Sequence, residues 1–418
     1  MKKRILSARM LWVGILVLAL AGSTAYAQPK PIQVGFSLGL SGSLASAGKA
    51  ALLSMQECAA DFNAKGGVLG RPVKLVYYDD HSRPADVPAI YTKLITVDKV
   101  DFVIGPYATG FVKSALPIIM EHKMIAPSLF ALQANKDFNY KYYFQMQPIG
   151  PDGVVNIAEG FFEVAAAQTP KPKTVAILAE DNEMGVLAQE AAEILSKKHG
   201  LKIVYSKRYP PATLDFTPLM RAMKAENPEI VFLATYPATS VGVIRASKEV
   251  KFVPKMIGGN MVGLQYGSVQ MELGPILENV VALHIYVPEP TLSFPGINEF
   301  LKKYQEKAVK EGLDPTGYYL PPYAYACLQL LLKSVEATKS LDQTTVGEYI
   351  RGNAHQTIVG EIRFGKNGEW WKPRNLYVQF RNIKGNTVQD FSGPGKMIVV
   401  YPKEWVSGPL VYPFPGWK

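Results

Sequence analysis

The sequence is poor in the residue types that build metal centres and disulfide-rich domains. Of its 418 residues, 2 are cysteine and 5 are histidine. The histidines stand far apart, with no i,i+4 pair and no other spacing typical of metal ligands: His81, His122, His199, His284 and His355. No phosphate-binding loop and no dinucleotide fingerprint is present. We therefore expect no metal, no cofactor and no disulfide framework.

The two cysteines, Cys58 and Cys327, each lie in an apolar run with helical spacing, over Leu52–Phe62 and Ala324–Leu332. Free cysteines of this kind are usually buried and behave as small apolar side chains. Free thiols are therefore the favoured interpretation, and a single disulfide in an oxidising compartment is the alternative.

Long hydrophobic runs are missing after the N-terminus, and no later stretch is long enough to span a bilayer. The one early run, from Met10 to Ala21, follows a cationic start and precedes Ala25-Tyr26-Ala27. This order is typical of a cleavable secretory signal, here over residues 1–27, and the run is short for a membrane span. No cysteine follows the cleavage point, so we expect an exported, soluble protein without a lipid anchor.

A basic patch for nucleic acid is also missing. The formal charge is +10, from 45 basic and 35 acidic residues. Lys2, Lys3, Arg4 and Arg9 belong to the predicted signal, which leaves 41 basic residues against 35 acidic ones and a charge of +6. These charges are dispersed, without a basic block interleaved with aromatic residues. We expect no nucleic-acid partner.

The sequence does contain a repeated pattern of apolar strand, turn and amphipathic helix. One series runs from a strand at Ile32–Leu38 to a short strand near Ile125–Ala126, and a second series begins after Pro148–Pro151. Such alternation is typical of parallel sheets with helices on both faces. It predicts an α/β fold of two lobes with a cleft between them. Ligands of open parallel sheets bind beyond the carboxyl ends of the strands.

One stretch has the features of an anion site. Asp101–Gly110 begins with a short apolar strand, turns at Gly105-Pro106 and leads into a predicted helix over Phe111–His122. The first N–H groups of a helix have no partner within it, and the helix dipole favours negative charge there. We expect a carboxylate to bind at this junction and to contact the Thr109 hydroxyl.

Two patterns suggest a secreted hydrolase, but in both cases a non-catalytic interpretation is favoured. Gly35-Phe36-Ser37-Leu38-Gly39 matches G-x-S-x-G, but that motif needs its serine on a sharp turn, whereas Ser37 lies inside a predicted strand. Asp79-Asp80-His81 could serve acid–base or metal chemistry, although aspartates after a strand more often cap a turn. We expect no enzyme activity, and a hydrolase using one of these patterns is the alternative from another class.

Tyrosines recur in predicted strand-end loops and linkers, at Tyr107, Tyr236, Tyr266, Tyr318 and Tyr319. Such residues can simply cover apolar surface, or they can line a shared cleft. The pattern by itself favours neither interpretation.

The C-terminal segment differs from the rest, since proline, glycine and aromatic residues dominate from Ser392 to Lys418. We expect residues 392–418 to form an extended tail laid over one lobe. Its aromatic residues would hold it there by burial: Trp405, Tyr412, Phe414 and Trp417.

A series of ordered motifs runs through the chain: Gly66–Pro72, Tyr78–Asp80, Val103–Tyr107, Glu180–Gly185 and Gly360–Phe364. Together they resemble the periplasmic branched-chain amino-acid (leucine/isoleucine/valine) binding protein family, over essentially the whole mature chain. The resemblance implies the type I periplasmic binding fold, in which two α/β lobes joined by three crossovers close on a ligand. It also implies a periplasmic protein, expected as a monomer, that delivers a small molecule to an ABC transporter permease in the inner membrane.

By this resemblance the first lobe holds residues 28–147 and 284–357, and the second holds residues 148–283 and 358–391. The turn at Ala108 and Thr109 matches the carboxylate-binding pair of the family, in agreement with the anion site inferred above. The next strand-end loop, Ser128–Phe130, would supply further backbone and hydroxyl contacts.

The far wall of the implied cleft departs from the family. Amino-acid receptors hold the ligand ammonium with an acidic residue after the strand at Met256–Ile257, but here the turn reads Gly258-Gly259-Asn260 and the matching residue is neutral. Met184 and Ala47 stand where the family has bulky aromatic residues. A buried ammonium without a counter-charge costs roughly several kcal/mol. These changes predict an aromatic or other apolar carboxylic acid as the ligand, benzoate-like or phenylpropenoate-like.

The expected ligand-binding residues are Ser41, Ala47, Tyr107, Ala108, Thr109, Ser128, Leu129, Phe130, Met184, Tyr236, Asn260 and Tyr319. A receptor for branched-chain amino acids or short amides is the alternative within the same class. A sensory ligand-binding module that docks onto a separate signalling protein is a further alternative.

Overall fold

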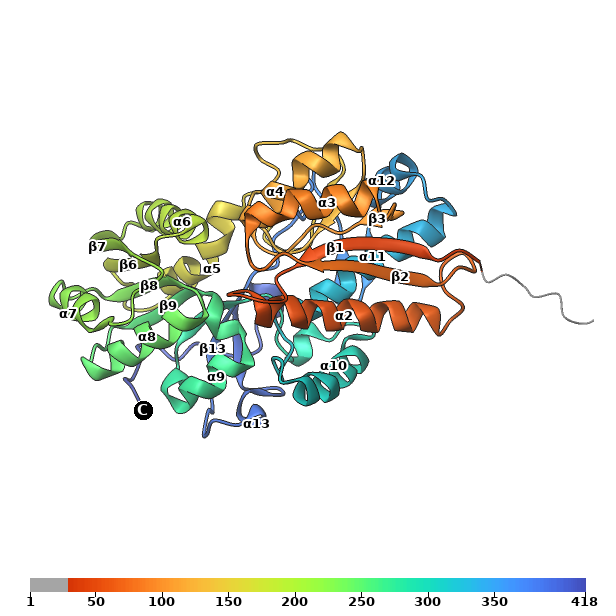
Figure 1. Cartoon of the computed structure of the whole chain (residues 1–418). Helices are drawn as coiled ribbons and strands as arrows, with labels where there is room; N and C mark the ends of the chain where they lie inside the picture. Colours follow the sequence, from red (N-terminus) through yellow and green to blue (C-terminus); the bar gives the residue numbers. More distant parts are fainter. Residues whose placement is uncertain (1–28) are drawn as a thin grey trace, which may run out of the picture.

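Two sheets, each flanked by helices, form two lobes that lie side by side (Figure 1). The computed structural model describes residues 29–418. The secretory signal predicted over residues 1–27 lies outside this range. Among the helices of residues 29–418, none has the length and apolar character needed to cross a bilayer.

The sheet of the first lobe has β1 at its centre, paired in parallel with β2 on one side and with β3 on the other. A bridge between Gly105 and Ser128 continues it toward the parallel pair of β4 and β5. The strands are β1 (Ile32–Leu38), β2 (Val73–Asp79), β3 (Phe102–Val103), β4 (Ala126–Ser128) and β5 (Tyr143–Gln145).

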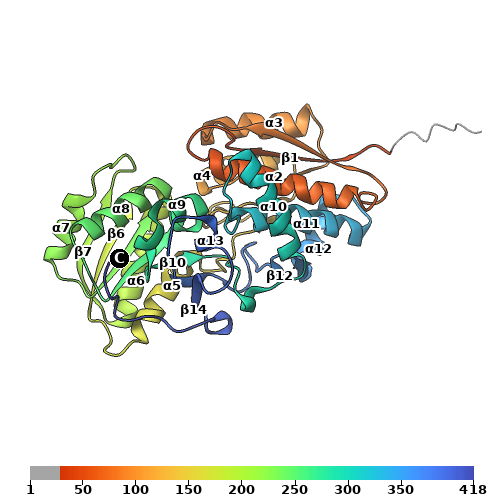
Figure 2. The same ribbon diagram turned by 90° about the horizontal axis from the view of Figure 1, so that it is seen from below.

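Helices from two separate parts of the sequence cover the first lobe. They are α2 (Ala45–Asn63), α3 (Val87–Thr96), α4 (Thr109–Glu121), α10 (Ile297–Glu311), α11 (Leu320–Thr338) and α12 (Gln343–Gly352). Figure 2 shows α10, α11 and α12 gathered beside α2, and both α10 and α11 pack on α2. Helices α10, α11 and α12 therefore belong to the same lobe as the N-terminal strands.

The second lobe is built on a seven-stranded sheet in the order β14-β13-β10-β9-β8-β6-β7. Its strands β6 to β10 pair in parallel, and β13 and β14 join one edge antiparallel. The strands are β6 (Thr174–Glu180), β7 (Lys202–Tyr209), β8 (Ile230–Thr235), β9 (Met256–Met261), β10 (Val281–His284), β13 (Leu376–Phe380) and β14 (Met397–Tyr401). Its helices are α5 (Gly153–Ala166), α6 (Glu183–His199), α7 (Thr217–Ala225), α8 (Pro237–Glu249), α9 (Gly267–Leu273) and α13 (Val388–Phe391).

The C-terminal segment differs from its prediction. Residues 392–418 do not simply lie over a lobe, because Met397–Tyr401 pairs with β13 as an edge strand of the second sheet. The apolar run Met397-Ile398-Val399-Val400-Tyr401 carries the strand signal that the surrounding prolines and glycines obscure. Beyond it the chain is extended, and Phe414 is buried while Trp417 donates its indole N–H to the Phe252 carbonyl at 2.7 Å.

The chain passes between the lobes near residues 145–153 and 284–297, as the alternating sheets require. The third passage lies later than the predicted boundary at residue 357. That boundary falls within the hairpin of β11 (His355–Thr357) and β12 (Gly360–Ile362). After the hairpin, the Gln145 backbone N–H on β5 still donates to the Gly368 carbonyl at 2.8 Å. The crossing to β13 therefore lies between about residues 370 and 376.

The two cysteines are free and buried, which confirms the favoured interpretation over the disulfide. Cys58 lies on α2 and Cys327 on α11, and these two helices pack against each other. Burial raises the pKa of both thiols, so both stay protonated and inert.

Strand β9 also runs further than predicted, because the glycines expected to turn the chain remain in the sheet. Gly258 and Gly259 adopt φ values of +143° and +133°, and Gly258 pairs with Val281 on β10. A Cβ at Gly258 would lie 1.6 Å from the Val281 carbonyl oxygen. Strand β10 can therefore pair with β9 only if residue 258 has no side chain. Because the strand continues through both glycines, Asn260 belongs to β9 and not to a turn.

Replacing Gly258 by alanine should lower the free energy of unfolding by about 3 kcal/mol or more, because the added Cβ overlaps the β10 backbone. The matched control is Gly200→Ala. Gly200 also has a positive φ of +71° but has nothing within 4 Å of its added Cβ, so only backbone strain of about 1 kcal/mol is expected. Urea denaturation measures both, and equal losses would contradict the steric explanation.

Candidate functional site

Two cavities that share lining residues open between the lobes, at the carboxyl ends of their strands. The outer cavity has a volume of about 630 Å³, and the inner cavity of about 40 Å³. Both are lined by Tyr107, Ala108, Thr109, Met184 and Tyr236. The first three come from the first lobe and the last two from the second, so the cavities form one cleft to which both lobes contribute.

The start of α4 supplies hydrogen-bond donors to this cleft. The helix begins at Thr109, two residues before the predicted start, and within the described residues neither the Thr109 nor the Gly110 backbone N–H has an acceptor. The Thr109 Oγ1 accepts the Leu132 N–H at 3.0 Å, which leaves its hydroxyl proton free to be donated. This arrangement suits an anion.

An unusual backbone conformation precedes these donors. Ala108 has φ +80° and ψ 147°, a region that residues other than glycine rarely adopt. Its own N–H donates to the Phe130 carbonyl at 2.9 Å, and its carbonyl accepts the N–H groups of Phe111 and Val112 at 3.1 and 3.0 Å. These hydrogen bonds keep the strained residue in place at the helix start.

Aromatic side chains form much of the cleft wall. The Tyr107 and Tyr319 hydroxyls lie 3.1 Å apart, and the Tyr319 ring also packs near Phe130 and Tyr266, with ring centroids 5.3 and 5.1 Å away. Burial raises the pKa of Tyr107, Tyr266 and Tyr319, so these phenols stay neutral. The cleft interpretation of the tyrosines is therefore correct for Tyr107, Tyr236, Tyr266 and Tyr319.

The opposite wall carries an acidic residue that the sequence reasoning missed. Glu180, the last residue of β6, lines the outer cavity and is buried. Its carboxylate accepts the Thr239 hydroxyl at 2.6 Å, the Asn182 amide at 2.8 Å and the Tyr236 N–H at 3.4 Å. The available signal was its position directly after the apolar run Val175–Ala179, since ligands of parallel sheets bind beyond the carboxyl ends of the strands. Its oxygens are thus already occupied by groups of the protein.

Across the cleft mouth an ion pair joins the two lobes. Lys113 on α4 lies 2.9 Å from Glu183 on α6, and both side chains are partly exposed. An exposed pair of this kind contributes at most about 1 kcal/mol. The ion pair is therefore too weak to hold the two lobes together by itself.

Comparison with known proteins identifies the family. Residues 31–378 match the family described as periplasmic binding protein. The chain belongs to this family. It is thus a periplasmic solute-binding protein and not an enzyme. The family implies a small-molecule ligand.

Individual relatives of this binding protein are distant in sequence. A Leu/Ile/Val-binding protein homolog from Brucella abortus is 24% identical over 404 residues, covering 93% of this chain and 96% of that protein. A branched-chain amino acid transporter substrate binding protein from Streptococcus pneumoniae, solved with isoleucine, has a TM-score of 0.71 at 18% identity, covering 89% of this chain and 100% of that one. A solute binding protein from Rhodopseudomonas palustris, solved with 3,4-dihydroxy benzoic acid, has the same TM-score and identity, covering 91% of this chain and 99% of that one. These likenesses establish the type I fold.

Nine of the twelve residues expected at the ligand line the cleft of this binding protein, and Asn260 is among them. Three do not line either cavity. Ser128 and Leu129 are fully buried, and Ser128, which belongs to β4 rather than to the loop, donates its hydroxyl to the Ala126 carbonyl. Ser41 donates its hydroxyl to Asp79 at 2.6 Å. Besides Glu180, the cleft-lining residues that were not predicted from the sequence include Leu132, Gln147 and Gln265.

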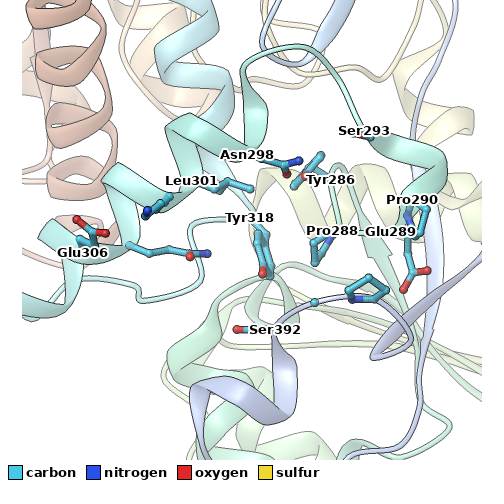
Figure 3. A pocket seen from close by; sticks show the side chains of 14 residues that line it. Tyr286, Pro288, Glu289, Pro290, Ser293, Asn298, Leu301, Glu306, Tyr318 and Ser392 are labelled. Atoms are coloured by element: carbon cyan, nitrogen blue, oxygen red, sulfur yellow. The ribbon is translucent and has the colours of Figure 1, made fainter.

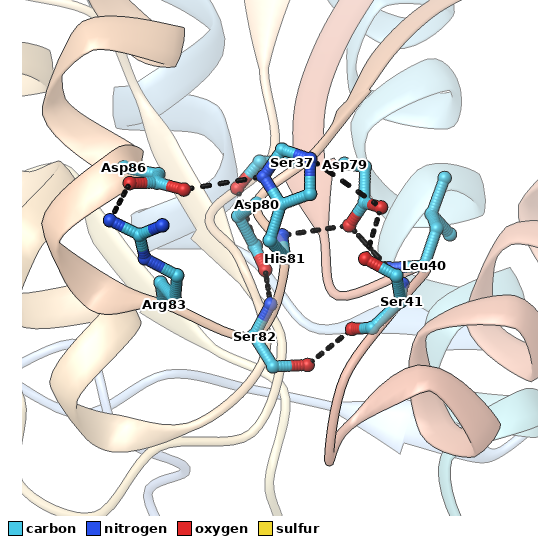
Figure 4. A network of polar contacts seen from close by, with 9 residues as sticks. All are labelled: Ser37, Leu40, Ser41, Asp79, Asp80, His81, Ser82, Arg83 and Asp86. Carbon is cyan, nitrogen blue, oxygen red and sulfur yellow. Dashed lines mark hydrogen bonds and ion pairs between the residues drawn. The ribbon is translucent and has the colours of Figure 1, made fainter.

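Ser41 belongs to a polar network in the loops that follow β1 and β2 (Figure 4). Although partial burial opposes it, hydrogen bonds from Ser41, His81 and Leu40 lower the pKa of Asp79 on balance. Asp80 accepts the buried Ser37 hydroxyl at 3.0 Å, and its pKa is raised by burial. Within the described residues no hydrogen bond joins Ser37 to a histidine, and both aspartates accept turn N–H groups. The turn-capping interpretation is therefore confirmed.

A third cavity, of about 570 Å³, lies apart from the cleft (Figure 3). It lies beside the second passage of the chain between the lobes, near residues 284–297. Tyr318 lines this cavity together with Tyr286, Pro288 and Ser392, and the Tyr318 and Tyr286 ring centroids are 6.0 Å apart. The cleft interpretation, which the sequence left open, does not hold for Tyr318, because Tyr318 and its neighbour Tyr319 line different cavities. Over residues 29–418, no group of three or more His, Cys, Asp or Glu side chains is arranged to hold a metal ion.

Ala108→Gly should raise the free energy of unfolding of this binding protein by about 1 kcal/mol, because glycine adopts the conformation of residue 108 without strain. The control is Ala47→Gly inside α2, which should lower it by about 1 kcal/mol. Urea denaturation of the ligand-free protein checks both. A loss of stability for Ala108→Gly would show that the observed backbone is unstrained.

Proposed function

We propose that this protein captures a small organic carboxylate, an aromatic or other apolar acid, and delivers it to an ABC transporter permease. The carboxylate would bind the Thr109 and Gly110 N–H groups and the Thr109 hydroxyl. The ring would lie among Tyr107, Tyr236 and Tyr319. Closure of the two lobes would then bury most of the ligand.

One observation carries this proposal: the free donors at the start of α4 face a cleft in which no cationic side chain lines either cavity of the described chain. Backbone N–H groups at a helix start can hold a carboxylate without a positive side chain. An outer cavity of about 630 Å³ is within the range of small-molecule sites, and its aromatic lining suits a flat apolar body.

The neutral far wall supports an acid without an ammonium group. Asn260 takes the place where amino-acid receptors of the family carry an acidic residue, and its amide N–H lies 3.1 Å from the Met184 sulfur. Neither the Asn260 amide nor the Met184 thioether carries the negative charge that a buried ammonium needs as a partner. The neighbour solved with 3,4-dihydroxy benzoic acid supports the same ligand class, since this fold can hold an aromatic acid.

Glu180 favours a second candidate, a receptor for amino acids. A buried carboxylate lines the outer cavity, and relatives are named for leucine, isoleucine and valine. We rank this candidate second because Thr239, Asn182 and Tyr236 already donate to that carboxylate. An ammonium would have to compete with these donors.

Isothermal titration calorimetry against benzoate, 3-phenylpropenoate, leucine and isoleucine tests the proposed function. We expect binding of at least one aromatic acid and no measurable binding of either amino acid. Tight binding of leucine with indifference to both aromatic acids would overturn the proposal in favour of the amino-acid receptor.

Thr109→Val should weaken carboxylate binding by roughly tenfold to a hundredfold, because a hydrogen bond to a charged group is lost, worth about 1.5–3 kcal/mol. Thr92→Val is the matched control. The Thr92 hydroxyl donates to the Pro88 carbonyl on the exposed face of α3, away from the cleft. Calorimetry should give an unchanged affinity for this control, and an unchanged affinity for Thr109→Val would remove Thr109 from the site.

Glu180→Gln separates the two candidates. It should change aromatic-acid affinity by less than about threefold, since that ligand brings no cation to the wall, whereas an amino-acid receptor should lose about tenfold or more. Glu163→Gln, on the exposed pair with Lys198 and outside both cavities of the cleft, is the control and should affect neither ligand class. A large loss of aromatic-acid affinity in Glu180→Gln would count against the proposed orientation of the ligand.

A further inference from the structure

Two buried amide side chains meet at the inner cavity. Asn260 on β9 is fully buried, and Gln265, in the short 3-10 helix η2 (Val262–Gln265), is 2% exposed. Both line the cavity of about 40 Å³. They come from a strand and from the turn that follows it, so the second lobe presents them together.

These amides lack the partners that buried polar groups normally have. Within residues 29–418, the Asn260 Oδ1 and the Gln265 Oε1 have no hydrogen-bond donor. The Asn260 Nδ2 contacts only the Met184 sulfur, a weak acceptor. Buried polar atoms are nearly always paired, because leaving them unpaired after removal from water costs free energy. These unpaired atoms make the inner cavity suited to a polar group from outside the chain.

The rest of the lining restricts which group this can be. No Asp, Glu, Lys, Arg or His of the described chain lines the inner cavity, so a charged end group would be buried without a counter-charge. The Tyr107 and Tyr319 hydroxyls are engaged with each other at 3.1 Å. A volume of about 40 Å³ admits a group of about the size of one water molecule.

A neutral hydroxyl meets the requirements of size and charge, and its single proton pairs one of the two amide oxygens. It can donate to one amide oxygen and accept an N–H from the other amide, because each amide has both a donor and an acceptor. Turning either amide by 180° exchanges its oxygen and nitrogen and leaves this complementarity intact. A methyl group of similar size would leave both oxygens unpaired.

We infer that the inner cavity binds a hydroxyl group of the ligand, held between Asn260 and Gln265, so that hydroxylated aromatic acids are the preferred ligands. This inference rests on the proposed function, since it assumes that the carboxylate binds at Thr109. It assigns Gln265 as a specificity residue for the end of the ligand remote from the carboxylate.

Matched ligands test this directly. Calorimetry on the full mature protein would compare benzoate, 4-methylbenzoate and 4-hydroxybenzoate, and the three corresponding 3-phenylpropenoates. We expect the 4-hydroxy acid of at least one series to bind about tenfold or more tightly than its 4-methyl analogue, because a site built for a hydroxyl leaves its polar groups unpaired with the analogue. Equal affinity for the 4-hydroxy and 4-methyl acids in both series would overturn the inference and leave the proposed function standing.

Matched variants locate the effect. Asn260→Leu and Gln265→Met replace each amide by an apolar side chain of similar size. Each should reduce the hydroxyl preference, measured as the ratio of the affinities for the 4-hydroxy and 4-methyl acids, to less than about threefold. Gln270→Met is the control, because Gln270 is equally buried but lies outside the inner cavity and donates to the Leu264 carbonyl. This control should keep the full preference.

Thermal unfolding of each variant shows whether it is folded, and affinity for the unsubstituted acid shows whether its cleft is intact. A hydroxyl preference that survives in both Asn260→Leu and Gln265→Met would overturn the inference, since the hydroxyl would then bind elsewhere. Should either variant fail to fold, the ligand comparison on the wild-type protein still decides the question. Failure of every aromatic acid to bind the wild-type protein would overturn the proposed function and this inference together.

Discussion

Polar groups that face the cleft without a protein partner are the constraint on which the rest of the site depends. The N–H groups of Thr109 and Gly110 lie at the start of α4, where no helical acceptor can reach them. A buried donor left unpaired costs about 1–3 kcal/mol. Closure of the lobes over these partly buried donors would therefore favour a ligand that brings an acceptor, and the strained Ala108 directly precedes the donors in the chain.

The two lobes contribute to this site in different ways. The first lobe provides the anchor from one continuous segment, in which β3 is followed within a few residues by the start of α4. The second provides a wall assembled from the ends of β6, β8 and β9, which lie next to one another only in the sheet. Gly258 and Gly259 let β9 pass between its neighbours and bring Asn260 into the cleft wall. Motion of one lobe against the other would thus open the wall without disturbing the anchor.

Membership of the periplasmic binding protein family explains the fold and the solute-binding role, but the local chemistry of the cleft wall decides the ligand. The same fold is seen with isoleucine in one neighbour and with a dihydroxybenzoate in another. In this chain the buried carboxylate of Glu180 already has three donors, while the amides of Asn260 and Gln265 have oxygens without any. This distribution of satisfied and unsatisfied groups favours a neutral polar end over a cationic one.

By itself the sequence determined the alternation of strands and helices, the strand–turn–helix junction at the start of α4, and the resemblance to the family. These features depend on residues close together along the chain, whose periodicity and turn chemistry act locally. Only the tertiary structure decided that Gln265 and Glu180 reach the cleft, that Tyr318 faces away from it, and that Met397–Tyr401 completes the second sheet. Such contacts join segments far apart in sequence, and which side chains converge depends on sheet order and strand length, which local patterns do not specify.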